Sequence, residues 1–183
     1  MEVGVRHAAS IWVVLGFLAG AAGVADAQEK DAGMKASAVA QTPEWQTLKS
    51  LVGRWEGVVE IEGKQVPTSV EMRLTGDGSA VMHVMDKDTS HEMVTMFHPD
   101  GERLLATHYC SAHNQPRMAL VTSAKANQIA FEFVDGTNIR PGDTHMKRLL
   151  LTVTDANHHD ATWTAAADGK ETPSLTFSYT RKR

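Results

Sequence analysis

The amino-acid sequence predicts an all-β domain, an antiparallel up-and-down β-barrel of about ten strands with a short N-terminal helix. Three observations predict this fold. Apolar and polar residues alternate with a period of two over many short runs, which is typical of half-buried strands. Turn-forming clusters rich in glycine and aspartate separate these runs. A meander of such strands closes into a barrel or folds into a sandwich, because either arrangement removes exposed strand edges.

The helix is predicted just before the first strand, over residues 43–51. Thr42 is a good N-cap residue, and Pro43 suits the first helical position. Trp45 and Leu48 follow at helical spacing, so one face of this segment is apolar. We therefore expect a single short helix that closes one end of the barrel.

The strands are predicted from ten alternating runs that follow the helix. In order they span residues 54–61, 69–74, 80–85, 92–97, 103–110, 117–123, 128–134, 146–153, 161–166 and 175–180. The longest irregular connections are 111–116 and 135–144, and the remaining connections are tight turns. The short turns favour neighbouring strands that pair in sequence order.

The first part of the chain has the features of a secretory signal peptide. A charged start that includes Arg6 precedes a short apolar stretch over residues 8–18, and the small residues that follow end in Ala25-Asp26-Ala27. The apolar stretch is shorter than the roughly 20 residues that a spanning helix needs. We expect cleavage after Ala27, a periplasmic or secreted product, and no stable membrane insertion after cleavage.

These observations divide the chain into three parts. Residues 1–27 are the predicted signal peptide, residues 28–41 a polar, alanine-rich and flexible lead-in, and residues 42–183 the barrel domain. The formal net charge is only -4, and no basic face is evident, so a nucleic-acid partner is not expected. Cys110 is the single cysteine, which excludes an internal disulfide.

Motifs at both ends of the predicted barrel resemble the calycin superfamily. Residues 48–55, with Gly53 and Trp55, are similar to the G-x-W entry of lipocalins and their calycin relatives. The last predicted strand ends in Arg181, and in calycins the corresponding arginine packs across that tryptophan. The block 91–118 resembles a group of exported bacterial lipocalin-like proteins of uncharacterised function. The middle lipocalin motif, T-D-Y, has no match, so the resemblance favours a calycin relative over a true lipocalin.

Candidate binding residues gather around the central strands. If the lone Cys110 is buried, as cysteine usually is, the period of two sends His108 inward beside it. A histidine inside an apolar barrel needs a polar partner. Asn114 and Arg117 flank the loop that follows, and His145 begins a strand after the other long connection. We predict that these polar side chains face one common space, with the alternative that Asn114 and Arg117 only hold their loop.

Metal and catalytic signatures are missing from the sequence. The histidines lack the paired spacing of zinc ligands, so most are interpreted as surface or loop residues, with His158-His159 in a turn. There is no G-x-S-x-G stretch and no glycine-rich phosphate loop. We assign no metal ligands and no catalytic residues.

The sequence predicts a barrel that binds a small, partly apolar ligand in its interior, where polar groups orient the ligand. Flexible methionines on successive strands suit an adaptable apolar interior: Met72, Met82, Met85, Met93, Met96, Met118 and Met146. Three alternatives stay open. The first is a haem-binding barrel like the nitrobindins, with His108 or His145 as iron ligand. The second is a barrel enzyme with His108 as acid/base, and the third is a filled barrel that serves as an interaction module.

Overall fold

The computed structural model describes residues 42–183, which form one helix and eleven strands. Their bounds in chain order are α1 (Pro43–Ser50), β1 (Gly53–Ile61), β2 (Lys64–Thr75), β3 (Ala80–Met85), β4 (Met93–Asp100), β5 (Arg103–Tyr109), β6 (Gln115–Val121), β7 (Gln128–Thr137), β8 (His145–Asp155), β9 (His158–Ala167), β10 (Lys170–Glu171) and β11 (Leu175–Arg181). The predicted signal peptide (1–27) and lead-in (28–41) lie outside the described residues.

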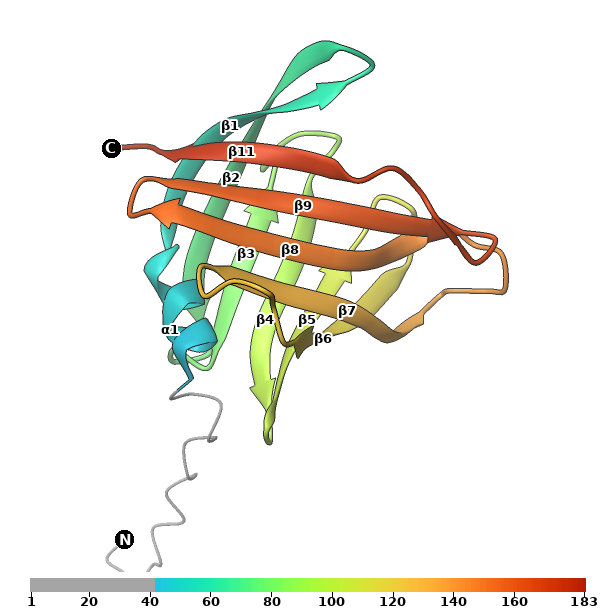
Figure 1. Ribbon diagram of the computed structural model, residues 1–183, viewed down its shortest axis with the longest axis horizontal. Coiled ribbons are helices and arrows are strands. Elements are labelled where there is room, and N and C mark those ends of the chain that lie inside the picture. The colour runs from blue at the N-terminus through green and yellow to red at the C-terminus, as the bar shows by residue number, and fades with distance from the viewer. Residues whose placement is uncertain (1–41) are drawn as a thin grey trace, which may run out of the picture. The chain divides into compact units, whose positions relative to one another are not determined.

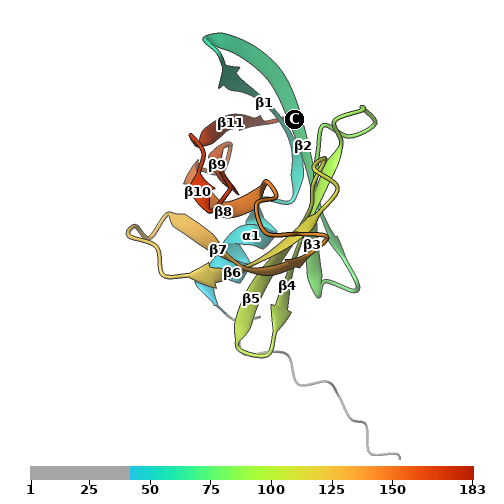
Figure 2. The same cartoon turned by 90° about the vertical axis from the view of Figure 1, so that its right-hand side faces the viewer.

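Ten of the strands form a closed antiparallel barrel. Strands β1 to β8 pair in sequence order, and β11 pairs with β1. Strand β9 pairs with both β8 and β11, which joins the two ends of the meander (Figures 1 and 2). The two-residue strand β10 adds to β9 outside this ring. The predicted fold, an antiparallel barrel with a short N-terminal helix, is confirmed.

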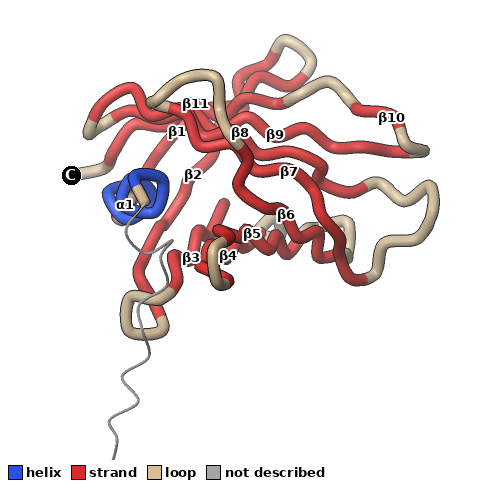
Figure 3. The backbone as a smooth tube through the Cα atoms, turned by 60° about the horizontal axis from the view of Figure 1, so that its bottom comes forward, coloured by secondary structure: helices blue, strands red, loops and turns tan. Residues whose placement is uncertain are grey.

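Helix α1 lies at one end of the barrel, as Figure 3 shows. The Thr42 side chain accepts a hydrogen bond from the Trp45 amide at 3.4 Å, and Pro43 occupies the first turn. Trp45 and Leu48 are buried in the same apolar cluster as Trp55 of β1, so the helix closes this end of the core. The described residues contain no helix with the length and hydropathy of a membrane span.

The core consists of inward-facing residues from all around the ring. Its buried members are Trp45, Leu48, Leu51, Trp55, Val70, Met72, Val81, Met85, Phe97, Leu104, Ala106, Met118, Ile129, Phe131, Leu149, Leu151, Ala161, Trp163 and Tyr179. Within each strand these residues recur with a period of two, because successive side chains of a strand point to opposite faces of the sheet. Polar residues at the same alternate positions of a strand therefore also point into the barrel.

Arg181 ties the last strand to the junction between α1 and β1. Its Nη1 donates to the Val52 carbonyl at 2.8 Å and its Nη2 to the Ser50 carbonyl at 2.9 Å. Its Cζ lies 4.1 Å from the centre of the Trp55 ring, in the position that the calycin resemblance implies. Gly53 makes room for it: a Cβ there would lie 2.6 Å from Nη1, and its φ of +142° favours glycine.

We expect Arg181→Ala to lower the free energy of unfolding by about 3 kcal/mol, because it leaves several carbonyl acceptors and the Trp55 face without their charged partner. Arg181→Lys keeps the charge but not the planar fork, so it should recover only part of this loss. Arg54→Ala is the control, since the Arg54 side chain is 74% exposed and its ion pair should contribute less than about 1 kcal/mol. Chemical denaturation of the three variants tests this. Equal stability of Arg181→Ala and Arg54→Ala would contradict it.

Candidate functional site

Three polar side chains form a row on the inner face of the central strands. His83 of β3 pairs in register with Thr95 of β4, and Thr95 pairs with His108 of β5. All three are at most 3% exposed. His108 Nδ1 lies 2.9 Å from Thr95 Oγ1, whereas His108 Nε2 and His83 Nδ1 have no hydrogen-bond partner among the described residues. This wall of the barrel therefore contains buried ring nitrogens that have no hydrogen-bond partner among the described residues.

A second polar row lies on the strands that complete the ring. Tyr179 of β11 pairs in register with His159 of β9, and their rings stack with centroids 5.1 Å apart. The Tyr179 hydroxyl lies 3.4 Å from Thr68 Oγ1. Gly57 lies between Thr68 and Tyr179 in the register and lets the tyrosine ring cross it, since a Cβ at Gly57 would lie 2.6 Å from Tyr179 Cδ1. Both ring nitrogens of His159 lack a partner within residues 42–183.

Across the barrel, His108 of the first row also contacts Trp163 of β9. Their ring centroids are 4.7 Å apart, although β5 and β9 are not neighbours in the sheet. The indole Nε1 of Trp163 also has no partner in the described part of the chain. Buried polar groups almost always have partners in proteins, so each of these nitrogens is a place for a water molecule or a ligand.

A cavity of about 170 Å³ opens beside this contact. Its lining residues are Met85, Met93, His108, Ser111, Met146, Trp163, Ala165, Thr172, Pro173, Leu175 and Phe177. None of these residues carries an ionised side chain at neutral pH. The cavity is thus mostly apolar, with His108 and Trp163 as the lining residues that bring unpartnered nitrogens.

Burial keeps the interior uncharged at neutral pH. Desolvation lowers the pKa of His83 from 6.5 to about 4, with a further lowering by the nearby His159. The pKa of His108 falls to about 4 for the same first reason, with His83 as the second cause. The pKa of His159 also falls to about 4, through burial and then through Arg181, and burial raises the pKa of Tyr179. The imidazoles are therefore neutral hydrogen-bonding groups.

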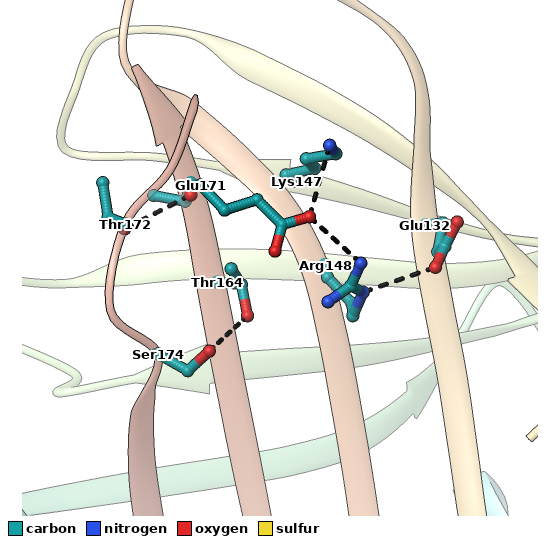
Figure 4. Close-up of polar contacts among 8 residues, drawn as sticks. Glu132, Lys147, Arg148, Thr164, Glu171, Thr172 and Ser174 are labelled. Atoms are coloured by element: carbon teal, nitrogen blue, oxygen red, sulfur yellow. Dashed lines mark hydrogen bonds and ion pairs between the residues drawn. The ribbon is translucent and has the colours of Figure 1, made fainter. Parts of the chain in front are cut away.

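One rim of the cavity is a short strap, residues 170–174, that runs alongside β9 (Figure 4). The Glu171 carboxylate accepts from Arg148 at 3.1 Å and lies 3.3 Å from Lys147 Nζ. The Thr172 amide donates to the Ala165 carbonyl at 2.9 Å. Ser174 Oγ lies 2.6 Å from Thr164 Oγ1. These contacts hold Thr172 and its neighbour Pro173 against the cavity.

Of the four predicted ligand-binding residues, the structure places only His108 in the cavity wall. Asn114 is buried at a barrel end, where its Nδ2 donates to the Thr144 carbonyl at 2.8 Å. His145 lies against Phe133, and its Nδ1 is 3.0 Å from the Asp143 carbonyl. Asn114 thus reaches the residue before His145, but neither lines the cavity.

Arg117 and Cys110 also differ from the prediction. Arg117 is exposed, because it alternates with the buried Met118, and its guanidinium donates two hydrogen bonds to Asp135 at 2.7 and 2.6 Å. It therefore does not share an interior space with His108. Cys110 is only partly buried, since β5 ends at Tyr109 and Cys110 already belongs to the following turn. Cys110 is thus less buried than a core residue, whereas His108, whose inward direction was derived from it, is buried.

Sequence reasoning missed His83, His159 and Trp163 as site residues. His83 has the parity of the buried Val81 and Met85, so the alternation in this strand already carried the signal. His159 was interpreted as a turn residue, but β9 begins at His158, three residues before the predicted strand. When the alternation of inward and outward residues is extended from Trp163 back to His159, it predicts that the His159 side chain points into the barrel. The interpretation of these histidines as surface residues is therefore wrong.

The arrangement bears on the metal, haem and enzyme alternatives. Within residues 42–183 no three His, Cys, Asp or Glu side chains are placed to hold a metal ion. The cavity beside His108, of about 170 Å³, is smaller than the roughly 300–1,000 Å³ of typical ligand pockets. A catalytic base works best with a pKa near the working pH, whereas the pKa of His108 is about 4.

The buried histidines predict a specific loss of stability in acid. Each has an ordinary pKa of 6.5 and a folded pKa of about 4. Between pH 4 and pH 6.5 the unfolded chain therefore binds more protons than the folded protein. The free energy of unfolding is thus highest above pH 6.5 and falls as the pH drops toward 4. Each histidine contributes about 1.4 kcal/mol per pH unit to this fall.

We expect His83→Met to remove about 1.4 kcal/mol per pH unit from that slope. His158→Gln is the control, because this histidine, next to His159 in the sequence, is exposed. Unfolding free energies measured by urea denaturation from pH 7.5 to 4 provide the check. Parallel profiles for wild type and His83→Met would show that His83 titrates normally in the fold.

Comparisons with known proteins support the fold and go no further. No protein-family model matches this chain, and no curated protein matches it. The crystal structure of Rv2717c from M. tuberculosis is similar, with a TM-score of 0.52 and 16% identity over 78% of this chain and 99% of that one. A DUF3598-family protein of unknown function, Npun_R4044 from Nostoc punctiforme PCC 73102, has a TM-score of 0.50 and 13% identity over 74% of this chain. The matched part spans about half, 49%, of that protein. The chain is thus a closed antiparallel β-barrel whose shape is shared with these two proteins.

Proposed function

We propose that this protein is an exported, lipocalin-like barrel that binds a small, partly apolar ligand in the cavity between β5 and β9. The observation that carries the proposal is the pairing of an apolar cavity of about 170 Å³ with two unpartnered nitrogens, His108 Nε2 and Trp163 Nε1, on residues of its wall. Ligand sites in proteins combine an apolar lining with a few polar groups in this way. Export is proposed from the signal-peptide features of residues 1–27 and implies a periplasmic or secreted site of action.

Binding follows from two separate contributions. Transfer of apolar ligand surface from water to the methionine-rich lining provides affinity, at roughly 25 cal/mol per Å². A buried hydrogen-bonding group without a partner costs about 1–3 kcal/mol, so a ligand atom that pairs with Trp163 or His108 recovers part of that penalty. Methionine side chains adapt to ligand shape because they are unbranched and flexible. Affinity and orientation thus come from different groups of the same cavity.

The chain also offers a way to fill the cavity without touching its polar groups. Ala165 lines the cavity, so Ala165→Leu should occupy part of its volume. Ala119→Leu is the control, because Ala119 lies on β6 next to the inward-facing Met118 and therefore has the opposite parity.

Native mass spectrometry of full-length protein purified from its host tests the proposal. We expect wild type and Ala119→Leu to retain a small molecule and Ala165→Leu to lose most of it, with a thermal midpoint that drops when the molecule is removed. Absence of any retained mass from wild type, together with a midpoint that extraction with organic solvent does not change, would contradict the proposal.

A further inference from the structure

The volume of the cavity limits the size of its ligand. A dry protein cavity of roughly 150 Å³ lined by aliphatic and aromatic side chains holds a single benzene molecule. The cavity beside His108 has about 170 Å³, so it accommodates one ring with a small substituent. A sterol, a long acyl chain or a two-ring molecule would extend beyond the cavity or require its wall to move.

The apolar lining favours an aromatic ring over an aliphatic one. Met85, Met93 and Met146 approach the cavity from three different strands, and Phe177 completes its apolar wall. Thioether sulfurs make favourable contacts with aromatic rings, worth about 0.3–1.5 kcal/mol each. Several methionines around one ring-sized space are therefore complementary to an aromatic guest.

The polar groups determine which substituent the ring carries. Indole Nε1–H only donates hydrogen bonds, so Trp163 requires an acceptor atom on the ligand. His108 Nδ1 is bonded to Thr95 Oγ1, and its Nε2 donates or accepts according to the tautomer. A hydroxyl oxygen suits both partners, since it accepts from Trp163 and matches either tautomer of His108. A carbonyl oxygen accepts from Trp163, and it accepts from His108 as well only in the tautomer that carries the proton on Nε2.

Charge on the ligand is disfavoured. No lining residue is a lysine, arginine, aspartate or glutamate, and the described residues bring no ionised group to the His108–Trp163 contact. Moving an isolated carboxylate or ammonium into such a site carries a large desolvation penalty. The ligand must therefore enter in its neutral form.

We propose that the cavity takes an uncharged, single-ring aromatic molecule with a hydroxyl or carbonyl oxygen, and that this oxygen accepts a hydrogen bond from Trp163 Nε1. The inference rests on the proposed function and specifies its ligand class. Phenol and toluene are the probes, because they have the same size and differ in the oxygen, and benzoate is the charged probe.

The decisive quantity is the change in affinity between wild type and Trp163→Phe. Phenol is better hydrated than toluene, so the ratio of their affinities for one protein reflects both hydration and the hydrogen bond to Trp163. Hydration is the same for both proteins, so it cancels when this affinity ratio is compared between wild type and variant. We expect Trp163→Phe to weaken phenol binding about tenfold more than toluene binding, the effect of one lost hydrogen bond. Trp45→Phe is the matched control, since Trp45 is buried but does not line the cavity, and it should change the ratio little.

A second measurement needs no variant. In ¹H–¹⁵N spectra of the full chain, the Trp163 Nε1–H resonance should move downfield with phenol and much less with toluene, because only phenol accepts its hydrogen. Benzoate at neutral pH should bind at least tenfold more weakly than phenol.

The outcomes separate this inference from the proposed function. Equal losses of phenol and toluene affinity in Trp163→Phe, or benzoate binding as tight as phenol, would overturn the ligand class while leaving a binding barrel in place. If none of the probes binds but wild type still retains a molecule that Ala165→Leu loses, the ring-sized neutral class is wrong and the proposed function stands. Failure of both experiments overturns both.

Discussion

The pairing of β9 with two neighbours is the constraint on which the rest of the structure depends. Strand β9 bonds to β8 along one edge and to β11 along the other, which turns an open meander into a ring. Closure places β9 across the interior from β5, so Trp163 and His108 touch although neither their sequence positions nor their sheet neighbours bring them together. The site therefore exists only in the closed barrel.

Closure also makes the polarity of the interior costly. A single residue cannot turn from the inner to the outer face of the barrel unless the register of the whole strand shifts. Each polar residue at an inward-facing position is therefore removed from water. The barrel meets this constraint with neutral imidazoles, the hydroxyl pair of Thr68 and Tyr179 and aromatic rings rather than with charges. Even so, several nitrogens have no protein partner in the described residues. Natural cores seldom keep such groups without water or a ligand, so these nitrogens call for a partner from one of these two sources.

Much of the fold was predictable from the sequence, because a period of two and short turns are local signals. The ten strands, the helix at 43–51 and the approach of Arg181 to Trp55 all follow from such signals or from the calycin resemblance. The site was predictable only in part. His108 was predicted from the alternation of inward and outward residues along its strand. Arg117 was predicted only because it follows the same loop, and the alternation in its own strand directs its side chain outward to Asp135.

The residues that were missed needed information that the sequence does not hold locally. Trp163 becomes a site residue only through contact across the barrel, which depends on closure and on the register of β8 with β9. That register contains bulges near Met146 and near Val153, and bulges are not visible in the alternation. His159 was hidden for a simpler reason, since the start of its strand was placed three residues too late.

The most direct test of the account is a high-resolution crystal structure of the full-length protein as isolated. We predict ordered density inside the barrel, within hydrogen-bond distance of Trp163 Nε1 and His108 Nε2 and enclosed by the methionine side chains. Water or a small molecule at that position would fulfil the need of these nitrogens for partners. An interior in which both nitrogens bond to protein atoms, with the methionines packed into the cavity and no density between them, would contradict it.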